Sequence, residues 1–308
     1  MTTTFRETIK WRTQYMQRQW EFSQWEGREY TDALYEKDGK IARITLNRPE
    51  KRNALNDKMF EDMLAGLHQA NDDPEVRVVI IKGAGIAFCS GHELSSPVGE
   101  ESPPVHPSLK PTIRDFYGLE RRRCSKHEHL FHFPKPTIAQ VHGRCVGAGE
   151  AISASCDFTI ATEDSVFGVR GFTALPLGFS CYVGAWPAGS HKLRAGHLRP
   201  ERTGLDMERI GAVNKAVPVD QLEEEVNKWA QAVLLIAAEP LAIQKELING
   251  IQDITGMGAS WRTHYAGHIG LQWVKFRKDE VSFYKAKKDS GLKGFLDDRA
   301  AHTSGPGH

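Results

Sequence analysis

The stretch VVIIKGAGIAFCSGHEL, from Val78 to Leu94, decides the fold of this chain. Its run of β-branched apolar residues predicts a buried strand, and the glycines that follow predict a tight bend. The same pattern recurs further along the chain, where TIAQVHGRCVGAGE runs from Thr137 to Glu150. Each strand-to-glycine turn can offer one unpaired backbone N–H. Together the two turns predict a cradle with two donors for a developing oxyanion.

The composition is that of an ordinary globular protein and excludes several functional classes. The 308 residues include 40 basic and 39 acidic side chains, so the net charge of +1 gives no reason to expect nucleic acid or an anionic membrane as partner. No apolar run approaches the ~20 residues of a membrane span. The polar N-terminal residues lack the apolar region of a secretory signal, so we expect none. Five cysteines without CxxC spacing predict buried, reduced thiols, and we expect a soluble, cytoplasmic protein.

The chain divides into three parts on its sequence pattern. Residues 1–29 predict an N-terminal helical extension, because Trp and Tyr recur there between charged residues. Residues 30–218 alternate strands and helices and predict an α/β core. Residues 219–308 predict a C-terminal helical region that ends in a frayed tail.

Local signals place the individual elements. Asp38 and Gly39 predict the turn of a hairpin that spans 33–46, and Asn56 or Asp57 is expected to cap the helix that follows. The expected strands are Val76–Lys82, Ile138–His142 and Phe158–Ala161. The expected helices are Asn56–Asn71, Arg114–His132, Gly149–Ser155, Gln221–Ala238, Leu241–Ile254 and Ser260–Phe283.

Six motifs in order make the sequence resemble the crotonase (enoyl-CoA hydratase/isomerase) superfamily from roughly Ile41 to Pro218, with an echo at Ser290–Arg299. The motifs are LNRPEKRNALN (46–56), AFCSGHEL (87–94), PKPTIA (134–139), the segment 143–157, VFG (166–168) and GAVNKAVP (211–218). The resemblance implies a spiral of ββα repeats with a C-terminal helical trimerisation region, in a homotrimer or homohexamer. It also implies an acyl-CoA thioester as substrate, no permanently bound cofactor, and a role in fatty acid or ring degradation.

The resemblance also assigns roles to individual positions. Carried over residue by residue, the two oxyanion donors are the backbone N–H groups of His92 and Ala148. The turn from Arg52 to Ala54 matches the segment that receives the adenine and ribose of coenzyme A. The positions expected to bind coenzyme A or its thioester end are Arg52, Ala54, Ser90, Leu94, Gly147, Phe295 and Arg299.

The sequence departs from the family where hydratases carry two glutamates. In register, these positions are Ala151 and Gly171, and neither side chain can move a proton. Glu150 lies one residue away, which on a helix turns a side chain by about 100°. It is a candidate acid or base, with helix capping or a salt bridge as the alternative.

Two residues near the second vacant position, Arg170 just before it and Tyr182 after it, suggest other chemistry. Arg170 could hold a substrate carboxylate with two hydrogen bonds, which suits decarboxylation or hydrolysis of a C–C bond, unless it is a surface residue or paired with an Asp. Tyr182 is a candidate proton donor. The Pro-rich stretch 97–111 and nearby aromatic residues suggest a bulky or cyclic acyl group.

Two further motifs are incomplete. His127, His129 and His132 lack the i, i+4 spacing of a zinc-binding helix, so no metal is expected, although His127 and His132 remain possible acids or bases. The segment 83–88 lacks the third glycine of a dinucleotide fingerprint. The leading hypothesis is therefore an acyl-CoA enzyme similar to enoyl-CoA hydratase/isomerase, a lyase in broad class. The alternatives are a C–C hydrolase or decarboxylase of a keto- or carboxy-acyl-CoA, and a non-catalytic CoA-binding homologue.

Overall fold

The computed structural model describes residues 27–93, 112–168 and 201–259, together with Arg277, residues 289–291 and Gly294. The predicted Pro-rich segment 97–111 lies outside these residues. So does the predicted helix Ser260–Phe283, apart from Arg277, and nearly all of the N-terminal extension.

A six-stranded sheet forms the centre of the molecule. Its order is β1-β2-β3-β5-β7-β10, with β1 antiparallel to β2 and the remaining neighbours parallel. The strands are β1 Ala33–Asp38, β2 Ile41–Leu46, β3 Val78–Gly83, β5 Thr137–Val141, β7 Phe158–Thr162 and β10 Lys215–Val217. The predicted hairpin is confirmed as β1 and β2, and all three predicted strands are present.

A smaller sheet of four strands, in the order β4-β6-β8-β9, stands beside the first. It contains β4 Ala87–Cys89, β6 Arg144–Val146, β8 Val166–Gly168 and β9 Arg202–Thr203. Strands β3, β5 and β7 of the large sheet are each followed directly by β4, β6 or β8 of the small one. Helices α3 (Ile113–Phe131) and α4 (Ala148–Ser155) follow β4 and β6. This succession confirms the predicted α/β fold of ββα units.

Three of the remaining helices were predicted and differ from the prediction only at their ends: α2 Asp57–Asp72, α9 Leu222–Leu234 and α10 Ala238–Ile254. Three short helices were not predicted: η2 Pro49–Lys51, α8 Gly204–Arg209 and η3 Val219–Gln221. Asn56 caps α2, since its Oδ1 accepts a 2.8 Å hydrogen bond from Met59 N. The predicted helix 221–238 ends early, and α10 begins at Ala238 with Pro240 in its first turn, where a missing N–H costs nothing. In the described segments, no helix combines the length and apolar character that crossing a bilayer requires.

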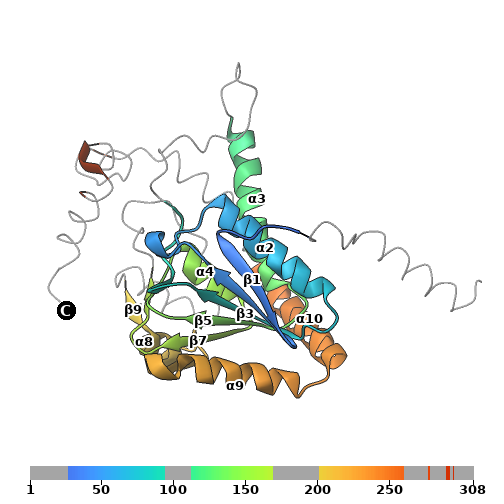
Figure 1. Cartoon of the computed structure of the whole chain (residues 1–308). Coiled ribbons are helices and arrows are strands. Elements are labelled where there is room, and N and C mark those ends of the chain that lie inside the picture. The colour runs from blue at the N-terminus through green and yellow to red at the C-terminus, as the bar shows by residue number, and fades with distance from the viewer. Residues whose placement is uncertain are drawn as a thin grey trace, which may run out of the picture.

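Helices cover both faces of the six-stranded sheet (Figure 1). Because successive strand residues point to opposite faces, Val79 and Ile81 of β3 join the core beneath α2, while Val78 and Ile80 join the core beneath α9. All four are buried. Burial on both faces explains why β3 is a continuous apolar run instead of an alternating one.

A buried carboxylate fastens the start of the described chain to α2. The Asp62 side chain is fully buried and accepts hydrogen bonds from Arg28 Nη2 at 3.1 Å, Asp32 N at 3.1 Å and Thr31 N at 3.2 Å, and it pairs with Lys58. Burial alone would raise the pKa of Asp62, but these donors hold it at about 2. Because the ordinary value is 3.8, this stabilisation is complete above that pH and is lost as the pH falls toward 2.

A second buried charge attaches α10 to the sheet. Lys245 Nζ lies 2.6 Å from Asp157 Oδ2, and the two side chains are 9% and 23% exposed. The same carboxylate oxygen accepts hydrogen bonds from Thr137 N and Oγ1, at the start of β5. The pair therefore joins α10, β5 and the turn before β7.

We expect Lys245→Met to lower the free energy of unfolding by about 2–3 kcal/mol, because it leaves a largely buried carboxylate without its cation. The matched control is Lys37→Met. Lys37 pairs with Asp73 and Glu75 at 2.7 Å and 2.6 Å, but it lies at the surface, and its loss should cost less than about 1 kcal/mol. Urea unfolding of both variants measures the difference, and equal costs would contradict this assignment.

Candidate active site

The site forms where two strands of the small sheet end side by side. β4 and β6 pair in parallel, with Ala87 opposite Arg144 and Cys89 opposite Cys145. The carboxyl ends of parallel strands lie at one edge of a sheet, which is where ligands bind in open α/β folds. The turn after β4 and the turn after β6 therefore meet at this edge.

Glycines allow the two turns to approach closely. A Cβ atom on Gly91 would lie 3.1 Å from Val146 O and 3.9 Å from Ala148 N, and a Cβ on Gly147 would lie 3.7 Å from Gly91 Cα. Both glycines have positive φ, 97° and 57°, which side chains disfavour. The segments that precede the two predicted donors are thus in contact.

Helix α4 is seated directly on the backbone of β4. A Cβ on Gly149 would lie 2.6 Å from Cys89 O and 2.8 Å from Cys89 Cβ. Glycine is required here because backbone occupies that space. This contact fixes the N-terminal turn of α4 against the chain that leads to His92.

The directions of the two predicted donor amides follow from the main chain. Ala148 is the first residue of α4, whose first-turn N–H groups have no acceptor one turn earlier. Leu55 forms an isolated parallel bridge with His92, in which Leu55 N donates to Gly91 O at 2.8 Å and Glu93 N donates to Leu55 O at 2.9 Å. The N–H of His92 itself therefore points to the side opposite Leu55. The His92 side chain is exposed.

Glu150 carries a buried carboxyl group in the first turn of α4. Its Oε2 is buried and has no hydrogen-bond partner among the described residues, although another part of the residue reaches the surface. Burial raises the pKa of Glu150 to about 7, and the positive charge of Arg202 on β9 opposes that rise. A carboxyl group with this pKa can exchange a proton near neutral pH. Ala151, which the sequence resemblance aligns with a family glutamate, is fully buried.

The segment that the sequence assigned to coenzyme A lies against the turn after β4. Ser90 N donates to Arg52 O at 3.0 Å, and Ser90 Oγ donates to Lys51 O at 3.3 Å. Arg52 is exposed and has a left-handed φ of 52°, while Ala54 is half-buried. Arg52, Ala54, Ser90 and Gly147 are therefore carried on neighbouring segments. Leu94, Arg170, Tyr182, Phe295 and Arg299 lie outside the described residues.

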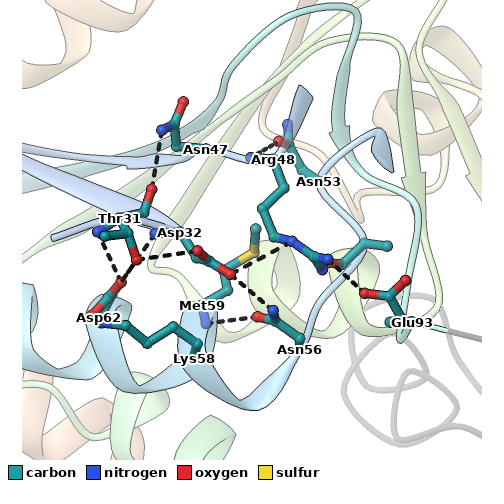
Figure 2. Close-up of polar contacts among 11 residues, drawn as sticks. Thr31, Asp32, Asn47, Arg48, Asn53, Asn56, Lys58, Met59, Asp62 and Glu93 are labelled. Carbon is teal, nitrogen blue, oxygen red and sulfur yellow. Dashed lines mark hydrogen bonds and ion pairs between the residues drawn. The ribbon is translucent and has the colours of Figure 1, made fainter. Parts of the chain in front are cut away.

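A polar network around Arg48 was not predicted from the sequence. Arg48 contacts Glu93, Asp32 and the Ala54 carbonyl, and Figure 2 shows its guanidinium between the two carboxylates. Asn53 is fully buried and also has a left-handed φ. Its side chain accepts from Arg48 N and donates to Ala84 O and Ala87 O. Asn53, which lies among other polar residues in the motif 46–56, was the sequence signal from which this network could have been suspected.

The three histidines of α3 have separate neighbours. His127 is buried with its ring edge against Phe60, His129 packs on His68 of α2 with ring centroids 4.7 Å apart, and His132 Nε2 lies 3.6 Å from Asp253 Oδ2. Burial lowers the pKa of His129, and the charges of His68 and His132 lower it further. Across the described part of the chain, no cluster of three His, Cys, Asp or Glu side chains is arranged to hold a metal ion.

Comparison with known proteins supports the relationship that the motifs indicated. Residues 36–250 match the family model described as enoyl-CoA hydratase/isomerase. A Mycobacterium tuberculosis protein named as enoyl-CoA hydratase EchA13 is 33% identical over 275 residues, which cover 83% of this chain and 86% of that protein.

Solved structures show the same similarity. An enoyl-CoA hydratase/isomerase from Xanthobacter autotrophicus Py2 is similar with a TM-score of 0.78 at 28% identity, covering 89% of this chain and 99% of that one. A protein from Mycobacterium smegmatis described as an enoyl-CoA hydratase has a TM-score of 0.70 at 27% identity, covering 78% and 93%. The chain belongs to the enoyl-CoA hydratase/isomerase family, within the crotonase superfamily.

We expect Gly149→Ala to destabilise the fold by about 1–3 kcal/mol, because the added methyl group overlaps Cys89 and forces α4 away from β4. Gly250→Ala is the matched control. Gly250 also lies in a helix, but its Cβ would meet no atom within 4 Å, so alanine should be neutral or stabilising by up to about 1 kcal/mol. Thermal unfolding of the two variants gives the comparison. A Gly149→Ala protein as stable as wild type would contradict this description of the site.

Proposed function

We propose that this protein binds an acyl-CoA thioester and stabilises its enolate with the backbone N–H groups of His92 and Ala148. The observation that carries the proposal is the contact between Gly91 and the Gly147–Ala148 turn, at the joint carboxyl edge of β4 and β6. Enolate formation places negative charge on the thioester oxygen, and fixed amide donors stabilise that charge without reorganising. The positive end of α4 adds to the effect.

We propose that coenzyme A lies against Ser90 and against the segment that carries Arg52 and Ala54, and that its thioester reaches this edge. That segment is hydrogen-bonded to Ser90, just before His92 in the chain. A nucleotide bound there would therefore lie close to the two proposed donor amides. Coenzyme A enters and leaves as part of the substrate and is not a resident group. Leu94, Gly147, Phe295 and Arg299 complete the set of positions proposed for coenzyme A.

Glu150 is the proposed general base. It takes a proton from the α-carbon of the thioester or from a water molecule that adds to the double bond. Three properties support this role: its carboxyl group is buried, one oxygen is unpaired among the described residues, and its pKa is about 7. It compensates for Ala151, which cannot move a proton. Gly147 N donates to Gly168 O at 3.2 Å, so Gly168, the last described residue before Arg170 in the sequence, lies beside the cradle.

A panel of CoA thioesters separates this function from its alternatives. Turnover of enoyl-CoA esters supports hydratase or isomerase chemistry, including on bulky or cyclic acyl groups. Turnover of β-keto- or malonyl-type esters supports C–C hydrolysis or decarboxylation, with Arg170 as the proposed carboxylate-binding residue. Tight binding of CoA without turnover on any ester would indicate a non-catalytic homologue and contradict the proposal.

Glu150→Gln tests the base directly. Because the carboxylate is the active form of a base, we expect wild-type kcat/KM to rise with pH through about 7 and then level off. Glu150→Gln should lower kcat at least about 100-fold and remove this limb of the pH profile. Glu163→Gln removes the same charge from an exposed position and should match wild type. A Glu150→Gln enzyme with the wild-type rate and profile would exclude this residue as the base.

A homotrimer or homohexamer is the proposed assembly. Helix α10 presents a continuous apolar stripe of exposed residues, Ile243, Leu247, Ile251 and Ile254, at helical spacing. In a single chain this stripe contacts water, which favours burial against a second copy. The described cysteines Cys89, Cys145 and Cys156 are free thiols, which supports the proposed cytoplasmic location.

We expect Ile251→Asp to shift the protein toward smaller assemblies, because a carboxylate in an apolar interface would lose its hydration. Light scattering after size-exclusion chromatography measures the mass of each species. Ile86→Asp is the control, since Ile86 is 75% exposed and lies in the turn between β3 and β4. A wild-type protein that is monomeric at micromolar concentration would refute the proposed assembly.

A further inference from the structure

Arg48 lies two residues after β2, immediately before η2, and its side chain is largely buried. Its guanidinium makes two short contacts, from Nη1 to Ala54 O at 2.6 Å and from Nη2 to Glu93 Oε2 at 2.6 Å. Nε lies 3.5 Å from Asp32 Oδ2, which also accepts a hydrogen bond from Asn56 Nδ2 at 2.8 Å. Figure 2 shows this arrangement. The side chains of Arg48 and Glu93 are each only 15% exposed.

The two short contacts join opposite sides of one bridge. Ala54 precedes Leu55, Glu93 follows His92, and Leu55 and His92 are the two residues of the isolated bridge. Main-chain hydrogen bonds hold the His92 peptide on either side, from Leu55 N to Gly91 O and from Glu93 N to Leu55 O. The Arg48 fork adds a charge-assisted connection at the residue immediately after His92. These two main-chain hydrogen bonds and the Arg48 fork therefore all restrain the orientation of the His92 amide, and the fork comes from a side chain.

We propose that Arg48 is a positioning residue for catalysis, which acts through Glu93 to fix the direction of the His92 N–H. The inference rests on the proposed function, because it requires that this amide donates to the thioester oxygen. Arg48 itself does not touch the reacting atoms. Its effect is geometric: a displacement of about 1 Å in a catalytic group can reduce a rate by about 100-fold.

The chemistry of arginine suits this task better than that of lysine. A planar fork reaches a main-chain carbonyl and a carboxylate at once, whereas an ammonium group acts as a single compact charge. The carboxylate of Glu93 accepts one hydrogen bond from the Arg48 guanidinium, and Glu93 directly follows His92, whose N–H is the proposed oxyanion donor. The Lys245–Asp157 ion pair has the same 2.6 Å separation but joins α10 to the turn before β7 and includes neither of the predicted donor segments. These two pairs can therefore be compared directly.

The experiment compares Arg48→Met, Arg48→Lys and Glu93→Gln with Lys245→Met, each below its unfolding transition. Arg48→Met should lower kcat by about 10–100-fold and change KM by a smaller factor, since it removes the donor to Ala54 O but leaves the proposed contacts of Arg52 and Ser90. Arg48→Lys should recover part of the loss. Glu93→Gln keeps the shape of the Glu93 side chain but removes its charge, so it is the milder variant to use if Arg48→Met folds poorly. Lys245→Met should lower the unfolding temperature while kcat stays at the wild-type value.

A binding measurement gives an answer that does not depend on turnover. An acyl-CoA thioester and the matching thioether, which lacks the carbonyl oxygen, differ only in the group that the cradle contacts. Wild type and Lys245→Met should prefer the thioester, and Arg48→Met should lose most of that preference. Equal preference and equal kcat in Arg48→Met and wild type would make Arg48 merely structural and overturn the inference. Equal binding of both ligands by wild type would instead overturn the proposed cradle, and the inference with it.

Discussion

The close approach of α4 to β4 is the constraint on which the candidate site depends. A helix can rest on a strand's backbone only where a glycine faces it, and Gly149 provides that contact against Cys89. The parallel pairing of β4 with β6 then brings Gly91 next to Gly147. The small sheet thus holds these turns together, whereas the six-stranded sheet contributes residues to both clusters of the buried apolar core.

This construction separates two tasks that a catalytic site must perform. In our proposal, main-chain amides bind the thioester oxygen, and these amides remain when side chains are substituted. Proton transfer depends on a single side chain, and its position on α4 has moved from residue 151 to residue 150 in our proposal. This arrangement buries the carboxyl group of Glu150 close to the thiol of Cys145. Burial raises the pKa of the Cys145 thiol, and the charge of Glu150 raises it to a smaller extent.

The sequence predicted local features well because their causes are local. The hairpin, the Asn56 cap and the apolar run of β3 each depend on neighbouring residues, and the structure confirms all three, with the turn at Gly39 and Lys40 instead of at Asp38 and Gly39. The predicted boundary between α9 and α10 was wrong by several residues, because α9 ends at Leu234 and α10 begins at Ala238 with Pro240 in its first turn. The fork of Arg48 could not be predicted. Its partners Ala54 and Glu93 come from separate segments, and a left-handed turn at Arg52 and Asn53 brings them together. The burial of Glu150 likewise depends on how the two sheets meet.

The Asp62 carboxylate has a consequence for where the chain can be shortened. The sequence suggested a boundary near residue 29, between an extension and the core, but the donors that satisfy Asp62 stand on both sides of it, with Arg28 before and Thr31 and Asp32 after. Trimming at that boundary would remove a cation from a fully buried anion, and the Lys58 ammonium would then have to compensate for it alone. An intact folding unit therefore begins no later than Arg28.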